Sequence, residues 1–259
     1  MAVVTLLTDF GTRDGYVGAM KGVIHALAPS ATVVDITHDV PPQDIPAAAF
    51  ALAQAAPFYP AGTIHVVVVD PGVGGRRRGV VLESEGQLYV GPDNGVLSLA
   101  APVEEGWEIT SAEFRRREVS ATFHGRDVFA PAAARLAGGA KPAAAGARVA
   151  LEGRLAPRPV LFSHNGRHVT GHVVHVDRFG NLITDIVASV LPSRCAVRVG
   201  SIEVPRLGVA YEDVARGEIV AYVGSAGTLE LAVRDGAASE VLGVGRGAPV
   251  VVMGSPVTP

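Results

Sequence analysis

The chain is poor in cysteine, in lysine and in aromatic residues. Cys195 is its single cysteine, which excludes an internal disulfide and a zinc site built from several cysteines. Charged residues make up only 18% of the 259 residues and the formal net charge is −3. The chain therefore lacks the basic footprint of nucleic-acid-binding proteins and any polybasic membrane patch, and we expect neither partner.

Long uninterrupted hydrophobic runs are also missing. Residues Ile45–Val69 contain no Asp, Glu, Lys or Arg, but Pro46, Pro57, Pro60 and Gly62 interrupt them. A spanning helix needs about 20 continuous apolar residues, so we predict a helix, a turn and a buried strand here. The first ten residues show no secretion signal, and we expect a cytoplasmic protein.

What is present is a globular composition, with 48% hydrophobic residues, and two different patterns along the chain. The first part alternates short apolar β-branched runs with segments of helical periodicity, which predicts a parallel sheet with right-handed crossovers. A hairpin follows over Gly79–Leu82 and Gln87–Val90. The predicted strands are Val3–Leu7, Thr32–Thr37 and Thr63–Val69, and the predicted helices start after Asp14 and Asp44 and cover Phe129–Leu136.

After about residue 158 the pattern changes to short alternating strands, which predicts a small antiparallel barrel. We therefore expect an α/β class protein with two domains. Residues 1–157 would form a Rossmann-like parallel-sheet domain, and residues 158–259 the smaller β-barrel domain. The predicted barrel strands are His168–Val176, Asn181–Ile186, Ala196–Val199, Glu218–Val223, Thr228–Ala232 and Pro249–Met253.

Two predicted strands run into a carboxylate at the sheet edge where open α/β proteins bind ligands. Asp9 follows the first strand and Asp70 follows the third. An Asp at the end of a buried strand is costly unless it is paired or binds something, so two on one edge favour a site over two turn residues. A carboxylate accepts both hydroxyls of a vicinal diol, which suits Asp9 to a ribose. Asp14 fits equally well as a helix N-cap.

Basic side chains follow these carboxylates. Arg76, Arg77 and Arg78 lie in a glycine-rich turn after Asp70 that lacks the Gly-Lys-Ser/Thr of a phosphate-binding loop. His124 precedes Gly-Arg-Asp and a predicted helix, although a single histidine is more often structural. His172 and His175 are three apart on a predicted strand and face opposite sides, so they are poor metal ligands together. A hard-metal site of His38, Asp39, Asp9 and Asp70 stays the weakest alternative.

Seven motifs, taken in order, resemble the S-adenosylmethionine hydroxide adenosyltransferases, which hydrolyse S-adenosylmethionine and are related to fluorinating and chlorinating nucleosidases. No single motif is decisive, but together they cover nearly the whole chain. They are Thr8–Gly18, His38-Asp39, Asp70–Arg78, Pro92–Gly95, Thr122–Asp127, Asp177–Asn181 and Gly224–Gly227.

The resemblance implies that water attacks C5′ of the ribose and yields adenosine and L-methionine, with no cofactor and no metal. It also implies a homotrimer with sites between neighbouring subunits. The catalytic set falls on Asp70, Arg77 and His124. By their chemistry, Arg77 would polarise the water, His124 would take or share its proton, and Asp70 would fix the arrangement. The ribose-binding carboxylate falls on Asp9.

The remaining substrate contacts implied by the resemblance fall in both predicted domains. Asp14 and Tyr16 line the site, and the methionine end falls near Asp177 and Ser225. Phe179 would stack on the adenine and Asn181 would meet its edge. These assignments are carried over position by position from the motifs.

Departures from the fluorinating enzymes favour water over halide as the nucleophile. Those enzymes carry tyrosine where this chain has Asp70, threonine for Val73 and serine for Gly125. Gln43 stands where they have a tryptophan, a difference that concerns one wall of the pocket and not the nucleophile. They also have a longer insertion where this chain has only Trp107–Val119. Halide-dependent cleavage, a non-catalytic adenosine-binding protein and a metal-dependent hydrolase remain as alternatives.

Overall fold

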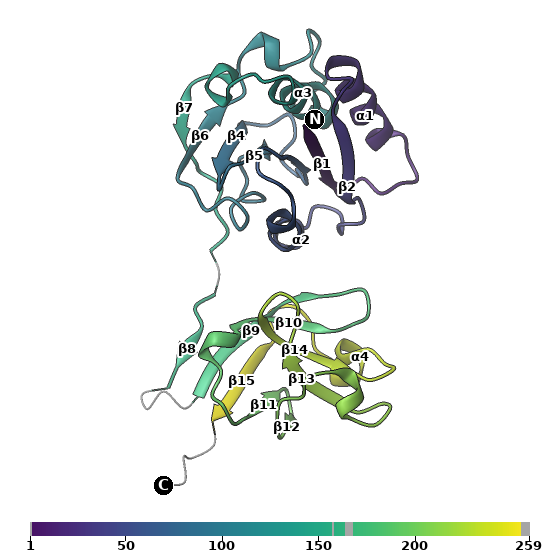
Figure 1. The fold of residues 1–259 in the computed structure, drawn as a ribbon, viewed down its shortest axis with the longest axis vertical. Helices are drawn as coiled ribbons and strands as arrows, with labels where there is room; N and C mark the ends of the chain where they lie inside the picture. The colour runs from purple at the N-terminus through teal and green to yellow at the C-terminus, as the bar shows by residue number, and fades with distance from the viewer. Residues whose placement is uncertain (1, 157, 164–167, 255–259) are drawn as a thin grey trace. The chain divides into compact units, whose positions relative to one another are not determined.

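The computed structural model describes residues 2–156, 158–163 and 168–254. The chain divides into two compact units, Met1–Leu155 and Ala156–Pro259. Helices and strands of each unit are labelled in Figure 1. Each unit has a hydrophobic core of its own, and each is described separately below.

The N-terminal unit is built on a seven-stranded sheet in the order β2-β1-β3-β5-β4-β6-β7. Strands β2, β1, β3 and β5 are parallel, whereas β4, β6 and β7 are antiparallel to their neighbours. The three strands predicted to be parallel, β1, β2 and β3, are parallel, but the sheet as a whole is mixed and not the parallel sheet expected for this domain. The strands are β1 (Val3–Thr8), β2 (Thr32–Thr37), β3 (Ile64–Val68), β4 (Gly79–Ser84), β5 (Gln87–Pro92), β6 (Glu105–Glu108) and β7 (Arg148–Ala150).

The change of direction begins at the β4–β5 hairpin. Its two turn residues, Glu85 and Gly86, have φ angles of 51° and 75°. Positive φ at both central positions is the backbone of a tight two-residue hairpin turn, so β4 must pair antiparallel to β5. The predicted hairpin is confirmed.

Helices cover both faces of this sheet because successive strand residues point to opposite sides. Leu6 of β1 packs in the core cluster that holds α1 (Tyr16–Leu27) and α3 (Ala130–Ala137), and Leu7 packs with α2 (Ile45–Ala55). In Figure 1, α1 and α3 lie on one side of the strands and α2 on the other.

The two predicted N-caps have different outcomes. Asp44 caps α2 through a 3.0 Å hydrogen bond from the Ala47 backbone N–H to its carboxylate. Asp14 does not cap α1, whose N-cap position is Gly15 without any side-chain cap. The short helical segments are Ala56–Phe58, Ala112–Phe114, Gly125–Phe129, Pro142–Ala145, Ala188–Val190 and Tyr211–Asp213.

The C-terminal unit is an antiparallel, nearly closed barrel, as predicted. Its strand order is β12-β11-β15-β9-β10-β14-β13, and β8 pairs with β9. Alternate residues such as Val197 and Val199 point into its core. The elements are β8 (Leu161–Phe162), β9 (His168–Val176), β10 (Leu182–Val187), β11 (Cys195–Val199), β12 (Ile202–Val204), β13 (Ile219–Val223), β14 (Thr228–Val233), α4 (Ala238–Leu242) and β15 (Pro249–Gly254).

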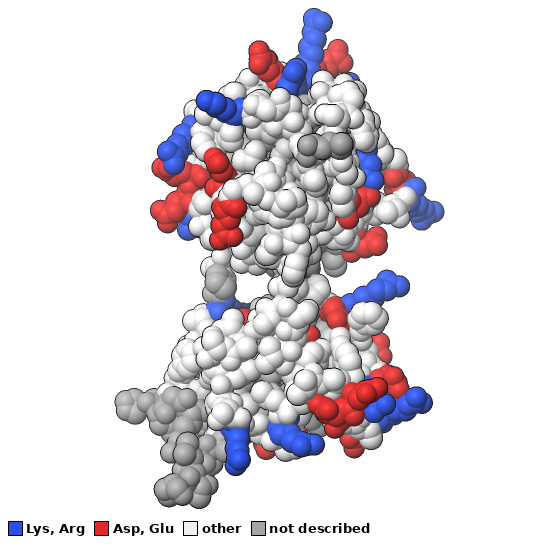
Figure 2. All heavy atoms as spheres, in the orientation of Figure 1, with Lys and Arg blue, Asp and Glu red and all other residues white. Residues whose placement is uncertain are grey.

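The uncharged segment Ile45–Val69 forms α2, a short helical turn and β3, as predicted. In the part of the chain that the structure describes, no helix has both the length and the apolar character that crossing a membrane requires. On the face shown in Figure 2, acidic and basic side chains are intermixed.

Candidate active site

Three side chains from distant parts of the sequence form one hydrogen-bonded group. Arg77 Nε donates to Asp70 Oδ1 over 2.8 Å, and Arg77 Nη2 donates to Asp70 Oδ2. The same Nη2 lies 2.7 Å from Nδ1 of His124. The Asp70 side chain is 4% exposed and that of Arg77 12%, so both charges are largely removed from water. The structure therefore brings together the three residues that the sequence singled out.

A close backbone contact brings the two segments of this group together. Asp70 follows β3, and the turn after it places Gly74 against Ala121, a few residues before His124. Gly74 has a φ of +74°, and a Cβ there would overlap the Ala121 carbonyl oxygen. Only glycine combines that backbone conformation with that approach.

The contact between Arg77 and His124 fixes the state of the imidazole. A guanidinium only donates hydrogen bonds, so Nδ1 of His124 must be the acceptor and the ring proton must lie on Nε2. Burial lowers the pKa of His124, and the positive charge of Arg77 lowers it further, against the opposing effect of Asp70. His124 is therefore neutral here, with its lone pair directed at Arg77.

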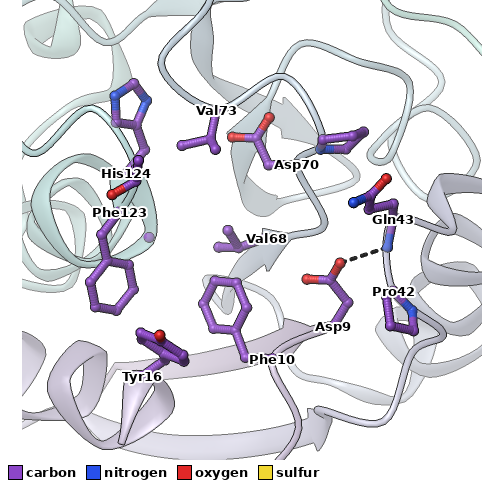
Figure 3. A pocket seen from close by; sticks show the side chains of 13 residues that line it. Asp9, Phe10, Tyr16, Pro42, Gln43, Val68, Asp70, Val73, Phe123 and His124 are labelled. Carbon is purple, nitrogen blue, oxygen red and sulfur yellow. Dashed lines mark hydrogen bonds between the residues drawn. The ribbon is translucent and has the colours of Figure 1, made fainter. Parts of the chain in front are cut away.

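A cavity of about 410 Å³ opens beside this group. Asp70 and His124 line it, whereas Arg77 is not among the lining residues and has its guanidinium over the Phe129 ring at 5.4 Å. Figure 3 shows Asp9, Gln43 and Asp70 on one side of the cavity and His124 and Phe123 on the other. The full lining is Asp9, Phe10, Tyr16, Pro42, Gln43, Val68, Asp70, Pro71, Val73, Thr122, Phe123, His124 and Gly125.

Asp9 lines this cavity and accepts a hydrogen bond from Gln43, whose backbone conformation is strained. Its Oδ2 accepts a 2.8 Å hydrogen bond from the Gln43 backbone N–H, drawn in Figure 3. Gln43 has a φ of 65°, a left-handed conformation that costs a residue other than glycine about 1 kcal/mol or more. Asp9 thus stabilises the backbone that brings Gln43 to the cavity wall. Asp14 is exposed and lies outside the lining.

An aromatic cluster forms one wall of the cavity. Phe10, Tyr16 and Phe123 meet edge to face, with ring centroids 5.3 to 6.0 Å apart. The sequence singled out Tyr16 alone. Phe10 directly follows Asp9, and Phe123 directly precedes His124. Their position beside two predicted site residues was the signal available in the sequence.

The predicted contacts of the C-terminal unit separate into two groups. Phe179 and Asn181 line a second cavity, of about 630 Å³, together with Tyr211. Asp177 is not among the lining residues, and it accepts hydrogen bonds from the backbone N–H groups of Phe179 and Asn181 at 2.9 and 2.8 Å. Ser225 is exposed in the β13–β14 turn and is not part of this lining.

The histidines considered as metal ligands have other contacts. His38 Nδ1 lies 2.9 Å from Thr8 Oγ1, and its Nε2 lies 3.0 Å from Asp35 Oδ1. His172 Nδ1 lies 3.6 Å from Asp185 Oδ2. Among the described residues, no group of three or more His, Cys, Asp or Glu side chains is arranged to hold a metal ion.

Comparison with known proteins identifies relatives over almost the whole chain. The family described as SAM hydroxide adenosyltransferase N-terminal domain matches residues 4–146, and the corresponding C-terminal domain matches residues 171–251. A protein named (R)-S-adenosyl-L-methionine hydrolase from Thermus thermophilus is 42% identical, covering 96% of this chain and 99% of the relative. A Salinispora tropica protein of the same name is 43% identical over 94% and 95%.

A more distant relative and a solved structure also match this chain. A protein named Fluorinase from an Actinoplanes species is 27% identical over 71% of each chain. The crystal structure of an uncharacterized conserved protein from Thermotoga maritima has a TM-score of 0.89 and 37% identity. It covers 96% of this chain and 99% of that one.

Proposed function

Because the chain belongs to the SAM hydroxide adenosyltransferase family, we propose that it hydrolyses (R)-S-adenosyl-L-methionine to adenosine and L-methionine. The observation that carries the proposal is the group of Asp70, Arg77 and His124 at a cavity that also contains Asp9. A carboxylate for the ribose and a polar group for a water molecule are the two elements that this reaction needs.

The reaction is an in-line displacement at C5′ of the ribose. The water oxygen forms a bond to C5′ while the C5′–S bond breaks and its electron pair goes to sulfur. The sulfonium leaves as the neutral thioether of methionine, so no general acid is required at the leaving group. The enzyme has to position the water and accept one proton from it, and help of this kind is worth roughly 10²–10⁴-fold.

The hydrogen bonds suggest how the three residues divide this work. His124 Nδ1 is engaged by Arg77, so its Nε2–H is left to donate to the water oxygen. Arg77 uses two of the roughly four acceptor positions of the Asp70 carboxylate, and the others are free to take the proton of the water. Arg77 acts as a positioning residue that fixes both partners.

The rest of the cavity suits the adenosyl and sulfonium groups. Asp9 accepts the ribose hydroxyls, and the aromatic cluster of Phe10, Tyr16 and Phe123 would attract the sulfonium cation through its ring faces. Attack of a hydroxide-like oxygen on a cation reduces charge separation, so a cavity that excludes bulk water favours the transition state. Asp14, near the start of α1, stays a proposed lining residue of the substrate site, although it lies outside the lining of this cavity.

The C-terminal unit supplies the contacts to the base in this proposal. Phe179 stacks on adenine, Asn181 meets its edge, and Asp177 and Ser225 lie toward the methionine end. The functional enzyme is a cytoplasmic homotrimer with sites between neighbouring subunits, and it needs no metal. The parallel strands β2, β1, β3 and β5 support the proposal that the N-terminal domain is Rossmann-like.

Reaction products and isotope incorporation test the proposal. The protein is incubated with each sulfonium epimer in H₂¹⁸O, with and without a chelator and with fluoride or chloride. We expect equal amounts of adenosine and methionine from the (R) epimer, with ¹⁸O in the 5′-hydroxyl and no effect of the chelator. Dependence on a halide would establish halide-driven cleavage instead. Bound adenosine without turnover would establish a binding protein, and loss of turnover with the chelator a metal-dependent hydrolase.

A further inference from the structure

A chain of hydrogen-bonded side chains runs from the wall of the second cavity to a buried carboxylate. Asn181 Nδ2 lies 3.2 Å from the Tyr211 hydroxyl, which lies 3.0 Å from the Tyr222 hydroxyl. Tyr222 donates to Glu230 Oε2 over 2.9 Å. Tyr222 and Glu230 are register partners on the neighbouring strands β13 and β14. The hydrolysis at Asp70 uses neither of them.

The chemistry of its members gives this chain one direction. Asp177 Oδ2 lies 2.9 Å from Asn181 Nδ2, and an ionised carboxylate only accepts, so it must face the NH₂ group of the amide. The second amide hydrogen then points to the Tyr211 oxygen. Since Tyr222 spends its only hydroxyl hydrogen on Glu230, Tyr211 must donate to Tyr222. The hydrogen bonds that lead from Asn181 through Tyr211 and Tyr222 therefore all run toward Glu230.

Glu230 is an unusual end for such a chain. It is 7% exposed, and Gly224 makes room for it, because a Cβ at Gly224 would overlap its carboxylate. Burial raises the pKa of the Glu230 carboxyl, the hydrogen bond from Tyr222 opposes that rise, and Asp177 adds to it. A carboxyl group in such surroundings costs free energy unless its hydrogen bonds compensate. Glu230 fixes Tyr222 by accepting its hydrogen bond, and Tyr222 in turn fixes Tyr211. Holding these two tyrosines in place gives a reason for a buried carboxyl group here.

The same chain determines which atom of Asn181 is left for a ligand. Both hydrogens of its amide are used by Asp177 and Tyr211, and Oδ1 has no hydrogen-bond partner within the described part of the chain. Asn181 lines the cavity together with Phe179, a residue that is 73% exposed. An amide oxygen accepts N–H groups and is repelled by carbonyl oxygens.

We infer that Glu230, acting through Tyr222 and Tyr211, is a positioning residue that selects a 6-aminopurine over a 6-oxopurine. It holds Asn181 so that Oδ1 meets the exocyclic amine of adenine, whereas hypoxanthine would present an oxygen to an oxygen. Turning the amide over would break its bonds to Asp177 and Tyr211. This inference rests on the proposed function, because it assumes that the second cavity binds the purine.

The test compares the dissociation constants of adenosine and inosine by titration calorimetry. In Tyr222→Phe the ring remains but Tyr211 loses its acceptor, so its hydroxyl becomes free to donate to Asn181 Oδ1 when the amide turns over, and only Asp177 still opposes that turn. We expect the preference for adenosine over inosine to fall roughly tenfold. Glu230→Leu should lose as much, whereas Glu230→Gln keeps an acceptor oxygen for Tyr222 and should stay within about twofold of wild type. In Tyr222→Phe and Glu230→Leu, KM for S-adenosylmethionine should rise while kcat changes little.

Thr184→Val is the matched control in the same barrel. It removes a buried 2.7 Å hydrogen bond from Thr184 Oγ1 to the Leu229 carbonyl and a 3.2 Å one from the Ile186 N–H to Oγ1. It therefore reports the cost of losing buried hydrogen bonds next to Glu230 without altering Asn181, Tyr211, Tyr222 or Glu230. Equal preferences in wild type and Tyr222→Phe would overturn the positioning role, as would an equal loss in Thr184→Val. If Tyr222→Phe loses the preference for adenosine over inosine but the wild-type protein does not cleave S-adenosylmethionine, only the hydrolase proposal is overturned. Absence of adenosine binding would overturn both.

Discussion

Arg77 donates through Nη2 to His124 Nδ1 over 2.7 Å while its Nε holds the Asp70 carboxylate. One guanidinium therefore orients an anion and a neutral imidazole at the same time. Both partners line the cavity, and Arg77 itself does not. A planar fork of donors is needed for this arrangement, and a lysine ammonium does not reproduce it.

We predict that Arg77→Lys lowers kcat by roughly 10²-fold or more, because the ammonium cannot bridge Asp70 and His124 in the same geometry. The dissociation constant of adenosine should change little, since Arg77 does not line the cavity. Arg76→Lys is the matched control, because Arg76 is the exposed neighbour in the same turn. Single-turnover rates of both variants decide the matter, and equal rates would remove Arg77 from the mechanism.

The imidazole of His124 leads to a prediction about pH. Burial and Arg77 lower its pKa below the ordinary value of 6.5, so it stays neutral down to that pH. Protonation at Nδ1 would set a cation against the guanidinium and break their contact. We expect kcat/KM to be independent of His124 between pH 8 and 6.5 and to fall only at lower pH.

The variant Arg77→Gln tests that assignment, because removal of the neighbouring charge should raise the pKa of His124 and move the acid limb to higher pH. Titration of the His124 ring followed by NMR gives the same quantity without turnover. A wild-type acid limb above pH 6.5 that tracks the His124 resonance would contradict the prediction.

Gly74 provides a prediction about the scaffold. In Gly74→Ala the added Cβ meets both a left-handed backbone and the Ala121 carbonyl, so the turn has to move away from the segment that leads to His124. We expect a loss of more than about 1 kcal/mol in the free energy of unfolding and a marked fall in kcat. Gly62→Ala is the control, since Gly62 has a φ of +83° but open space around it. Denaturant unfolding and turnover of the pair separate backbone strain from the lost approach, and equal effects would show that the approach is unimportant.

Local patterns predicted the elements better than their long-range pairing. The β4–β5 hairpin and the cap at Asp44 depend on neighbouring residues, and both are confirmed. By contrast, the antiparallel edge of the first sheet pairs β6 with β7, two short strands far apart in the sequence. Such pairing leaves no local periodicity to detect, so this outer edge of the sheet was not predicted, although the β4–β5 hairpin was.

In the candidate site, too, the sequence predicted the local placement of residues better than their long-range contacts. Asp9 and Asp70 could be placed at one sheet edge from the strand pattern alone. Arg77 and His124 are 47 residues apart, and their contact depends on the close approach of Gly74, which no spacing reveals. The roles that residue types suggested for Arg77 and His124 differ from those we propose from the direction of their hydrogen bond. Residue types limit the possible chemistry, and the contacts are what the proposed roles rest on.

The last prediction concerns His65, which is fully buried in the middle of the first sheet. Its Nδ1 lies 2.7 Å from Thr5 Oγ1, and its ring stacks on Tyr89 with centroids 5.0 Å apart. Burial lowers its pKa to about 4, so the folded protein keeps it neutral while the unfolded chain protonates near pH 6.5. As pH falls from 6.5 to 4 the unfolded state therefore binds a proton that the folded state does not. This proton uptake should lower the free energy of unfolding by about 3 kcal/mol.

Urea denaturation between pH 7.5 and 4.5 measures this contribution as a difference in slope between wild type and His65→Gln. The variant should be less stable at neutral pH, because Thr5 and Tyr89 lose their partner, but it should show a weaker decline toward acid. His25→Gln, which alters an exposed histidine in the last turn of α1, should keep the wild-type slope. Parallel curves for wild type and His65→Gln would mean that the buried imidazole does not control the acid stability of this fold.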